Sequence, residues 1–310
     1  MIFIDAKRVK WIIQPEITVP EGIAFFISIL HKNNDYMNVL CNSLVKLGAN
    51  VDGMLVLTPR IDFDSCFYAE TIEIDNAWDL LSRNDPFHYF ARLTADRVSC
   101  GYCTTGFFDG FFIPGTPSYH NDHTSRQFYI IEYNDNKESF ITVGTGKEGE
   151  ACLYEFPVDD FYNGIESFAT AKNEDKFFTS FIKCRDELPE IDLDTLISSI
   201  EDLISSGFDE ERALLDSGTL LSARNTRMIC EHAKLMKKRL DYIRDCYPER
   251  NLNTSSLENV CYAADRIMSL ESKSNRLNLI SLMDNEKEAM RSILLELKEK
   301  RKNGIDRSNC

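Results

Sequence analysis

The segment that decides the predicted fold is Asp109-Gly-Phe-Phe-Ile-Pro-Gly-Thr-Pro-Ser-Tyr-His-Asn-Asp-His-Thr-Ser-Arg-Gln-Phe-Tyr-Ile-Ile-Glu-Tyr-Asn-Asp-Asn-Lys-Glu-Ser-Phe-Ile-Thr-Val143. It contains two strand-like runs rich in β-branched and aromatic residues, 128–133 and 139–143. The residues between them, Asn134-Asp-Asn-Lys137, form a turn sequence because Asn and Asp tolerate a left-handed backbone. We therefore predict a β-hairpin that follows a histidine-containing loop, 114–123.

Composition limits the classes of protein to consider. The chain has 310 residues, enough for one large domain or two ordinary ones, and 43% of them are hydrophobic, which allows a substantial core. Its net charge is −15, from 50 acidic and 35 basic residues. Because nucleic-acid binding requires many Lys and Arg contacts with phosphate, we expect no nucleic-acid partner.

The sequence also indicates the compartment. It has no apolar run of about 18 residues, the length of a membrane-spanning helix, so no membrane span is expected. The first residues, 1–8, contain an acid and no long apolar segment, unlike a signal peptide. We interpret the ten cysteines as reduced thiols of a cytoplasmic protein and not as a disulfide framework.

Hydrophobic periodicity predicts a domain boundary near residue 190. We expect an α/β (α+β) domain over 1–190, a helical part over 191–304 that packs on it, and a frayed tail, 305–310. In the first domain the predicted elements are a β-leaning segment 1–30, a helix 36–47 ended by Gly48, a strand 51–58, short helices 76–81 and 86–94, strands within 101–157, and a helix 159–171. In the second they are helices 195–205, 222–246, 255–269 and 275–302.

One candidate site is a zinc centre. Cys100 and Cys103 are separated by two residues, as are His120 and His123, and two thiolates with two imidazoles bind Zn²⁺ tetrahedrally. However, the histidine spacing is shorter than the usual three to five residues, and aromatic residues fill the gap between the pairs. A zinc-binding module therefore remains only an alternative, and we predict no bound metal.

A second candidate is a cysteine nucleophile, which requires a nearby histidine and an acid to orient it. The candidate residues are Cys41, His123 and Asp135. Cys41 lies in the middle of the predicted helix, on its apolar face, whereas Tyr36 holds the first-turn position where the helix dipole would lower a thiol pKa. The pattern favours a buried structural role for Cys41.

A third group lies on the predicted helix 222–246. Glu231 and His232 are adjacent, and Arg239 follows seven residues after His232. We interpret them as a buried ion-pair and hydrogen-bond network that fixes this helix to the first half of the chain, because polar groups buried between domains need partners. The sequence has no phosphate loop, GxGxxG, HExxH or GxSxG motif, so no cofactor is predicted.

Taken together, several segments resemble a known family. Segment 109–114, the Tyr119-to-His123 loop and the hairpin strand are similar to the Asp-x-(Tyr/Phe)-x-x-Pro, Tyr-x-x-x-His and Gly-Tyr-Asp-Asp motifs of proteins like the N-terminal domain of butirosin biosynthesis protein H. Segment 231–240 resembles the Glu-His-Lys-x-x-Met-x-x-Arg motif of a less studied branch, as does the region of residues 28–47. The matching positions that become candidate binding residues are Asp109, Tyr119, His120, Glu231, His232 and Arg239.

The resemblance implies a papain-like fold and a place in bacterial peptide or aminoglycoside biosynthesis. Active members transfer an acyl group from a carrier-protein thioester to an amine, using a Cys that opens the first long helix, a His just before the hairpin strand, and an Asp. At these positions this chain has Tyr36, Arg126 or Gln127, and Asn134 or Asp135, with His123 one turn too early. Glu132 replaces the glycine of the family's Gly-Tyr-Asp motif.

These departures lead to two hypotheses. The first is an accessory, non-catalytic papain-like protein of a nonribosomal-peptide or related pathway, which binds a carrier-bound acyl or peptidyl group or a small-molecule product. The alternative is an active cysteine-dependent acyl or amide transferase that uses Cys41, His123 and Asp135. The expected partner is an acyl or peptidyl carrier protein or a small-molecule product.

Overall fold

A computed structural model of the chain shows two compact units. The sheet unit contains Met1–Asn33 and Phe67–Asp186, and the helical unit contains Asn34–Cys66 and Glu187–Cys310. The third crossing between the units, at residues 186–187, lies close to the predicted boundary at 190, but segment 34–66 belongs with the helices and not with the first domain. The structure describes residues 7–9, 15–17, 21–43, 46–49, 55–58, 61–75, 86–146, 150–172, 176–207, 223–248, 252–269 and 276–305.

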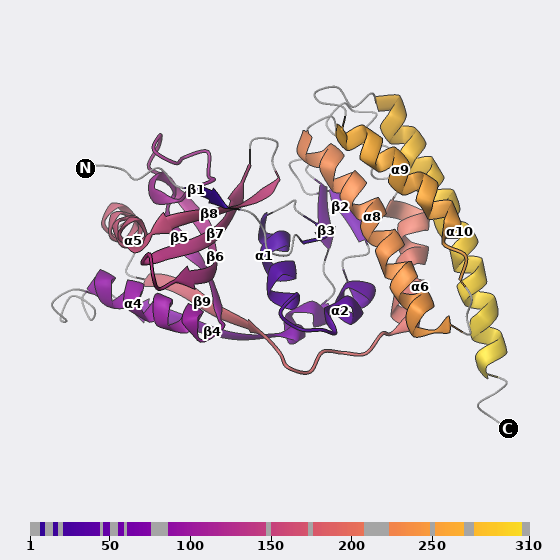
Figure 1. Cartoon of the computed structure of the whole chain (residues 1–310), viewed down its shortest axis with the longest axis horizontal. Coiled ribbons are helices and arrows are strands. Elements are labelled where there is room, and N and C mark those ends of the chain that lie inside the picture. Colours follow the sequence, from indigo (N-terminus) through magenta and orange to yellow (C-terminus); the bar gives the residue numbers. More distant parts are fainter. Residues whose placement is uncertain are drawn as a thin grey trace. The chain divides into compact units, whose positions relative to one another are not determined.

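A mixed α/β architecture is present, and an antiparallel sheet forms the centre of the sheet unit (Figure 1). Seven described strands are arranged in the order β1-β8-β7-β6-β5-β9-β4, and each neighbouring pair is antiparallel. The predicted hairpin is confirmed as β6 and β7. The strands are β1 (Lys7–Val9), β4 (Phe67–Asp75), β5 (Cys103–Asp109), β6 (Ser125–Asn134), β7 (Ser139–Thr145), β8 (Ala151–Pro157) and β9 (Lys176–Cys184).

The hairpin differs in detail from the expectation. Its left-handed residue is Glu138, with φ 47°, and not one of the Asn or Asp residues before it. A register shift between Ile130 and Glu132 interrupts the ladder with β7. Because such a bulge changes the alternation of side chains, Ile130 and Tyr133 both pack with the same core.

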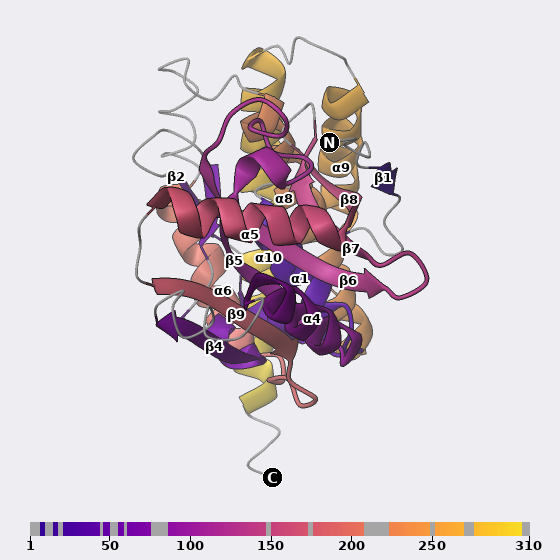
Figure 2. The same cartoon turned by 90° about the vertical axis from the view of Figure 1, so that its left-hand side faces the viewer.

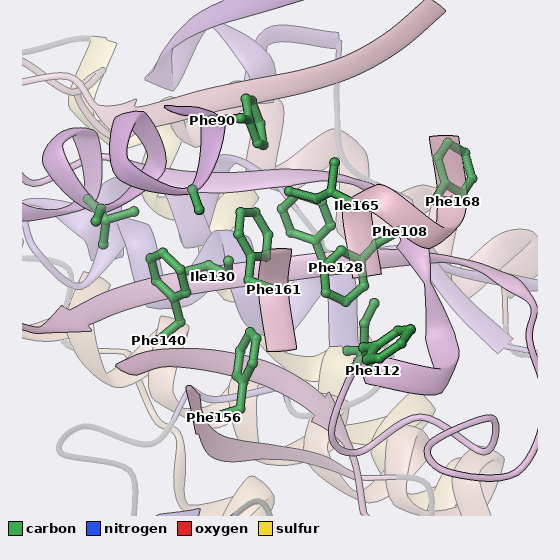
Figure 3. Packing of buried hydrophobic residues seen from close by; sticks show 14 residues of the cluster. Phe90, Phe108, Phe112, Phe128, Ile130, Phe140, Phe156, Phe161, Ile165 and Phe168 are labelled. Atoms are coloured by element: carbon green, nitrogen blue, oxygen red, sulfur yellow. The ribbon is translucent and has the colours of Figure 1, made fainter. Parts of the chain in front are cut away.

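One face of the sheet is covered by α4 (Pro86–Ser99) and α5 (Val158–Lys172), close to the predicted helices 86–94 and 159–171 (Figure 2). Phe161 of α5 is fully buried, and its ring centroid lies 5.3, 5.4 and 5.1 Å from those of Phe108, Phe128 and Phe140 (Figure 3). Each of three adjacent strands thus contributes one aromatic side chain that packs against Phe161. Burial of such a ring contributes roughly 1.5–3 kcal/mol.

The opposite face carries α1 (Glu21–Leu30), which contacts β6, β7, β8 and β9. Phe128 and Tyr129 point to opposite faces, and the Tyr129 ring lies 5.1 Å from that of Phe25. The expected β-leaning character is therefore wrong for residues 21–30. This helix is buried among apolar neighbours, and a continuously apolar run does not show a helical period.

The helical unit confirms the four predicted C-terminal helices within a few residues. It contains α6 (Leu193–Asp202), η3 (Leu203–Gly207), α8 (Ala223–Cys246), α9 (Ser255–Ser269) and α10 (Arg276–Ile305), together with α2 (Tyr36–Asn42), the ladder of β2 (Lys46–Ala49) with β3 (Leu55–Thr58), and η1 (Ile61–Cys66). Asp192 caps α6 by accepting hydrogen bonds from the backbone N–H groups of Asp194 and Thr195.

The predicted helix 36–47 is too long, because α2 ends at Asn42. Gly48, expected after the helix, instead pairs with Val56 in the β2–β3 ladder. Residues 76–81 and 306–310, predicted as a helix and as a frayed tail, lie outside the described residues, as do residues 51–54 of the predicted strand 51–58.

Two further expectations can be compared with the described part of the chain. None of its helices has the length and apolar composition needed to cross a membrane. Its nine cysteines are all free thiols. Within this part of the chain, stability therefore rests on packing and not on disulfide bonds.

Gly164 in α5 provides a test of the packing between helix and sheet. A Cβ atom at Gly164 would lie 2.5 Å from the Phe108 ring. We expect Gly164→Ala to lower the free energy of unfolding by about 1–3 kcal/mol, because overpacking outweighs the better helix propensity of alanine. Urea denaturation measures this change, and Glu166→Ala, at an exposed position of the same helix, is the control. Unchanged or increased stability of Gly164→Ala would show that the contact relaxes at little cost.

Candidate functional site

Asp109, at the end of β5, is a buried acid with three hydrogen-bond donors around its carboxylate. Its carboxylate accepts hydrogen bonds from the backbone N–H of Phe111 at 3.0 Å, from Ser167 Oγ at 2.6 Å and from His123 Nδ1 at 2.6 Å. Phe111 lies in the short helix η2 (Gly110–Phe112), and Ser167 lies in α5. The Asp109 side chain is only 5% exposed. The Asp109 carboxylate at the end of β5 therefore links, through hydrogen bonds, the turn that follows the strand, the histidine-containing loop and α5.

Hydrogen bonding keeps this acid ionised. Burial by itself raises the pKa of the Asp109 carboxyl, but hydrogen bonds from Ser167, His123 and Phe111 lower the pKa below its ordinary value. An ionised carboxylate only accepts hydrogen bonds, so Nδ1 of His123 carries the proton that it donates to Asp109. For the neutral imidazole this places the lone pair on Nε2.

The His123 ring is exposed, with 63% of the side chain accessible, but it is well oriented. Phe111 stacks on it with the ring centroids 4.4 Å apart and 14° between the planes. No described residue forms a hydrogen bond with Nε2. An imidazole with one nitrogen held by an ionised acid and the other accessible is suited to accept a proton or to bind a hydrogen-bond donor.

A second histidine borders the same cluster. His120 has a left-handed backbone, with φ 55°, and its ring stacks on Tyr119 at 4.0 Å and lies 5.5 Å from that of Phe111. Burial raises the pKa of the Asp160 carboxyl in α5 to about 6, while His120 acts in the opposite direction. Of the candidates from sequence, Asp109, Tyr119, His120 and His123 are thus brought together.

Asp135 does not join them. It lies in the turn after β6, whereas His123 precedes β6. At about 3.3 Å per residue, the ten residues of this strand separate its ends by roughly 30 Å. The acid that orients His123 is therefore Asp109, and the expectation for Asp135 is corrected.

Cys41 is fully buried in α2 of the helical unit. Its Sγ lies 3.9 Å from the Arg239 backbone oxygen, and burial raises the pKa of the thiol to about 12, against a smaller lowering by the Arg239 charge. At neutral pH the group is therefore a thiol and not a nucleophilic thiolate. This environment matches the structural role favoured by its position on the apolar face.

The four proposed zinc ligands do not form a cluster. Cys103 begins β5, and Cys100 lies just before it, whereas His123 binds Asp109 at the opposite end of that strand. A seven-residue strand spans about 20 Å. Among the described residues, no group of three or more His, Cys, Asp or Glu side chains is arranged to hold a metal ion.

Glu231, His232 and Arg239 have separate partners within the helical unit. Glu231 pairs with Arg227 at 3.8 Å, and the buried His232 Nδ1 lies 3.2 Å from Glu286 Oε1 in α10. The fully buried Arg239 donates hydrogen bonds to the backbone oxygens of Leu40 and Ser43 at the end of α2. Glu231 pairs within α8, whereas His232 links α8 to α10 and Arg239 links α8 to the end of α2.

Sequence reasoning missed a polar surface beside α1. Tyr129 Oη donates to Gln127 Oε1 at 2.9 Å, and Gln127 Nε2 donates to Thr105 Oγ1 at 3.2 Å. Phe107, half exposed, is the cross-strand partner of Gln127. We call Thr105, Phe107, Gln127 and Tyr129 the α1-side surface.

Gly22 lets the first turn of α1 approach this surface. A Cβ at Gly22 would lie 3.0 Å from Tyr129 Oη. Two features of the sequence relate to this surface. Residues 127 and 129 alternate along β6 and so share a face, and Gly22 lies near the start of an apolar segment. Neither identifies the surface until the register of β5 with β6 is known.

No family model matches the chain, and no curated protein matches it. The chemistry of the site therefore has to be argued from its own residues.

The buried Asp109 predicts a pH-dependent stability. Asp109→Asn should lower the free energy of unfolding at pH 7 by about 1–3 kcal/mol, because the amide is a weaker acceptor for its three donors. Since the folded pKa of Asp109 is lowered, its stabilisation is present above the unfolded pKa and is lost as the pH falls through the folded pKa. Denaturant unfolding at pH 7, 5 and 3 should therefore show the difference between wild type and variant shrinking. The exposed Asp122→Asn is the control, and a pH-independent difference would contradict the assignment.

Arg239 gives a test of the helical unit. Arg239→Ala should destabilise the protein by roughly 3 kcal/mol or more, because it empties a buried site and leaves the Leu40 and Ser43 oxygens without this donor. Arg244→Ala on the same helix, with 40% of its side chain exposed, should cost at most about 1 kcal/mol. Thermal melting compares the two, and equal melting temperatures for Arg239→Ala and wild type would show that the buried guanidinium is dispensable.

Proposed function

We propose that the sheet unit is a papain-like module without cysteine chemistry, which binds a carrier-bound acyl or peptidyl group or a related product in a cytoplasmic natural-product pathway. The proposal rests on the absence of a cysteine from α1, the helix that packs on the sheet. In the family that the sequence resembles, the nucleophile opens the first long helix. From the sequence that position is Tyr36, but Tyr36 opens the seven-residue α2 of the helical unit. The first helix that packs on the sheet is α1, whose first two residues are Glu21 and Gly22, and no position from 21 to 30 is a cysteine.

The histidine position supports the same interpretation. The family histidine stands just before the hairpin strand, at Arg126 or Gln127 of this chain. Gln127 lies on the α1-side surface with Tyr129, which is close to Gly22. A glycine and a glutamine thus occupy the neighbourhood in which a thiol and an imidazole would be required. An amide donates and accepts hydrogen bonds, but it does not act as a base near neutral pH.

The composition of the α1-side surface favours binding over catalysis. Phe107 offers a half-exposed aromatic ring, and the side chains of Gln127 and Tyr129 offer polar groups beside it. A peptidyl or acyl group has the corresponding combination of an apolar chain and amide or thioester oxygens. Recognition by this surface needs no thiolate, in agreement with the buried, protonated Cys41.

Binding is tested with the N-acetylcysteamine thioester of a short acyl or aminoacyl chain, titrated into the full-length protein by calorimetry. We expect saturable binding with the thioester recovered intact. Phe107→Ser should weaken binding by about tenfold, because burial of a phenylalanine contributes roughly 1.5–3 kcal/mol. Tyr89→Ser removes a similarly exposed aromatic from α4 and should have no effect. Absence of saturable binding across acyl and aminoacyl thioesters would contradict the proposal.

A second candidate is an active acyl transferase that uses His123. The observation that favours it is the buried acid at Nδ1, the arrangement that orients a catalytic histidine. This candidate predicts release of free thiol from the same thioester in the presence of an amine, lost in His123→Ala. The binding proposal predicts no release above the uncatalysed background in either protein.

Thiol reactivity separates the two candidates further. We expect iodoacetamide at pH 7 to label Cys41 much more slowly than the exposed Cys100 and Cys246, because thiolate is scarce at a pKa of about 12. Peptide mass spectrometry over a time course measures each rate. Labelling of Cys41 ahead of the two exposed thiols would favour the transferase.

A further inference from the structure

A lysine and a cysteine of the sheet unit are in direct contact away from the sites described above. Lys32 follows α1, and its Nζ lies 3.4 Å from Cys103 Sγ and 3.5 Å from the Gly101 backbone oxygen. Cys103 begins β5 and is fully buried, whereas Lys32 is exposed. The amine of an exposed, flexible side chain therefore lies against a buried sulfur.

The contact differs from the surroundings of Cys41, which is buried to the same extent. Cys41 Sγ contacts the backbone oxygen of Arg239, a group that cannot attack sulfur. Cys103 also contacts a backbone oxygen, that of Ile131 at 3.6 Å, but it has an amine in addition. An amine next to an oxidised sulfur is a nucleophile next to an electrophile.

We propose that Lys32 and Cys103 form a reversible sulfur–nitrogen cross-link when the protein meets a peroxide. The Cys103 thiolate attacks hydrogen peroxide, whose O–O bond breaks, and yields a sulfenic acid and water. The neutral Lys32 amine then attacks the sulfenyl sulfur. The S–N bond forms, the S–O bond breaks, and the oxygen leaves as a second water. Sulfur loses two electrons, and peroxide accepts them.

The geometry favours the second step over further oxidation. Lys32 has a flexible four-carbon stem that can close the remaining distance, while Cys103 is held in the β5–β9 ladder opposite Ile182. Burial slows the approach of every peroxide to the sulfur, whereas the amine is already in contact, so the amine captures the sulfenic acid before a second peroxide arrives. Burial also raises the pKa of the Cys103 thiol, with Lys32 opposing it, so the first step should be faster at alkaline pH.

The cross-link would join the end of α1 to the start of β5. Both segments belong to the sheet unit, and about seventy residues of chain separate them. A covalent bond between them restricts the unfolded chain. We therefore expect the oxidised protein to melt at a higher temperature than the reduced protein, and dithiothreitol to reverse the increase.

The experiment treats the full-length protein with hydrogen peroxide at pH 8.5 and analyses its peptides by mass spectrometry. The expected product is a Lys32–Cys103 peptide pair that has lost two hydrogens and is separated by dithiothreitol. Lys32→Arg keeps the positive charge but lacks a nucleophilic amine, so it should give no cross-link and no rise in melting temperature. Cys41 should remain unmodified in both proteins.

Two outcomes would overturn the proposal. One is Cys103 recovered as sulfinic acid or as the unchanged thiol with Lys32 unmodified in folded wild-type protein. The other is an equal rise in melting temperature for wild type and Lys32→Arg, since that rise could not come from the S–N bond. Circular dichroism confirms that the variant is folded before oxidation.

Discussion

The sheet unit depends on the packing of Phe161 against Phe108, Phe128 and Phe140. This contact fixes α5 on three adjacent strands, and the position of α5 determines the chemistry at the edge of the sheet. Asp160 precedes Phe161, and Ser167 lies two helical turns after Asp160, so both point to the same side of the helix. Ser167 then binds Asp109, while Asp160 lies close enough to His120 for their charges to interact. A purely apolar contact thereby places four polar groups.

The two faces of the sheet carry different chemistry. On the α5 side, an ionised buried acid orients an exposed imidazole. On the α1 side, an amide, a phenol and a half-exposed aromatic ring lie on the paired strands β5 and β6, and the phenol is close to Gly22 in the first turn of α1. The first arrangement is suited to proton transfer and the second to binding without it. Our proposal of a binding function rests on the second, because recognition by an amide, a phenol and an aromatic ring needs no proton transfer.

Arg239 has a comparable role in the helical unit. Its guanidinium is buried and donates to the last backbone oxygens of α2, which a short helix leaves unpaired. The contact is one of several that join segment 34–66 to the C-terminal helices, with the hydrogen bonds of Lys238 to Tyr36 and of Tyr242 to Asn38. The same contact explains the surroundings of Cys41, whose Sγ lies beside the Arg239 backbone. A cysteine that supports the attachment of two helices is poorly placed to react.

The sequence alone determined the local elements whose pattern is unambiguous. Alternating β-branched and aromatic residues predicted β6 and β7, and long amphipathic repeats predicted α8, α9 and α10, because these periods arise within single segments. It also identified Asp109, His120 and His123, which lie in one short region, as candidate functional residues. Only the tertiary structure decided that Asp109 and not Asp135 orients His123, that residues 21–30 form a helix buried on the sheet, and that Lys32 meets Cys103. These three findings depend on strand register and on contacts between distant segments. The hydrophobic periodicity of a single segment contains no information about register or long-range contacts.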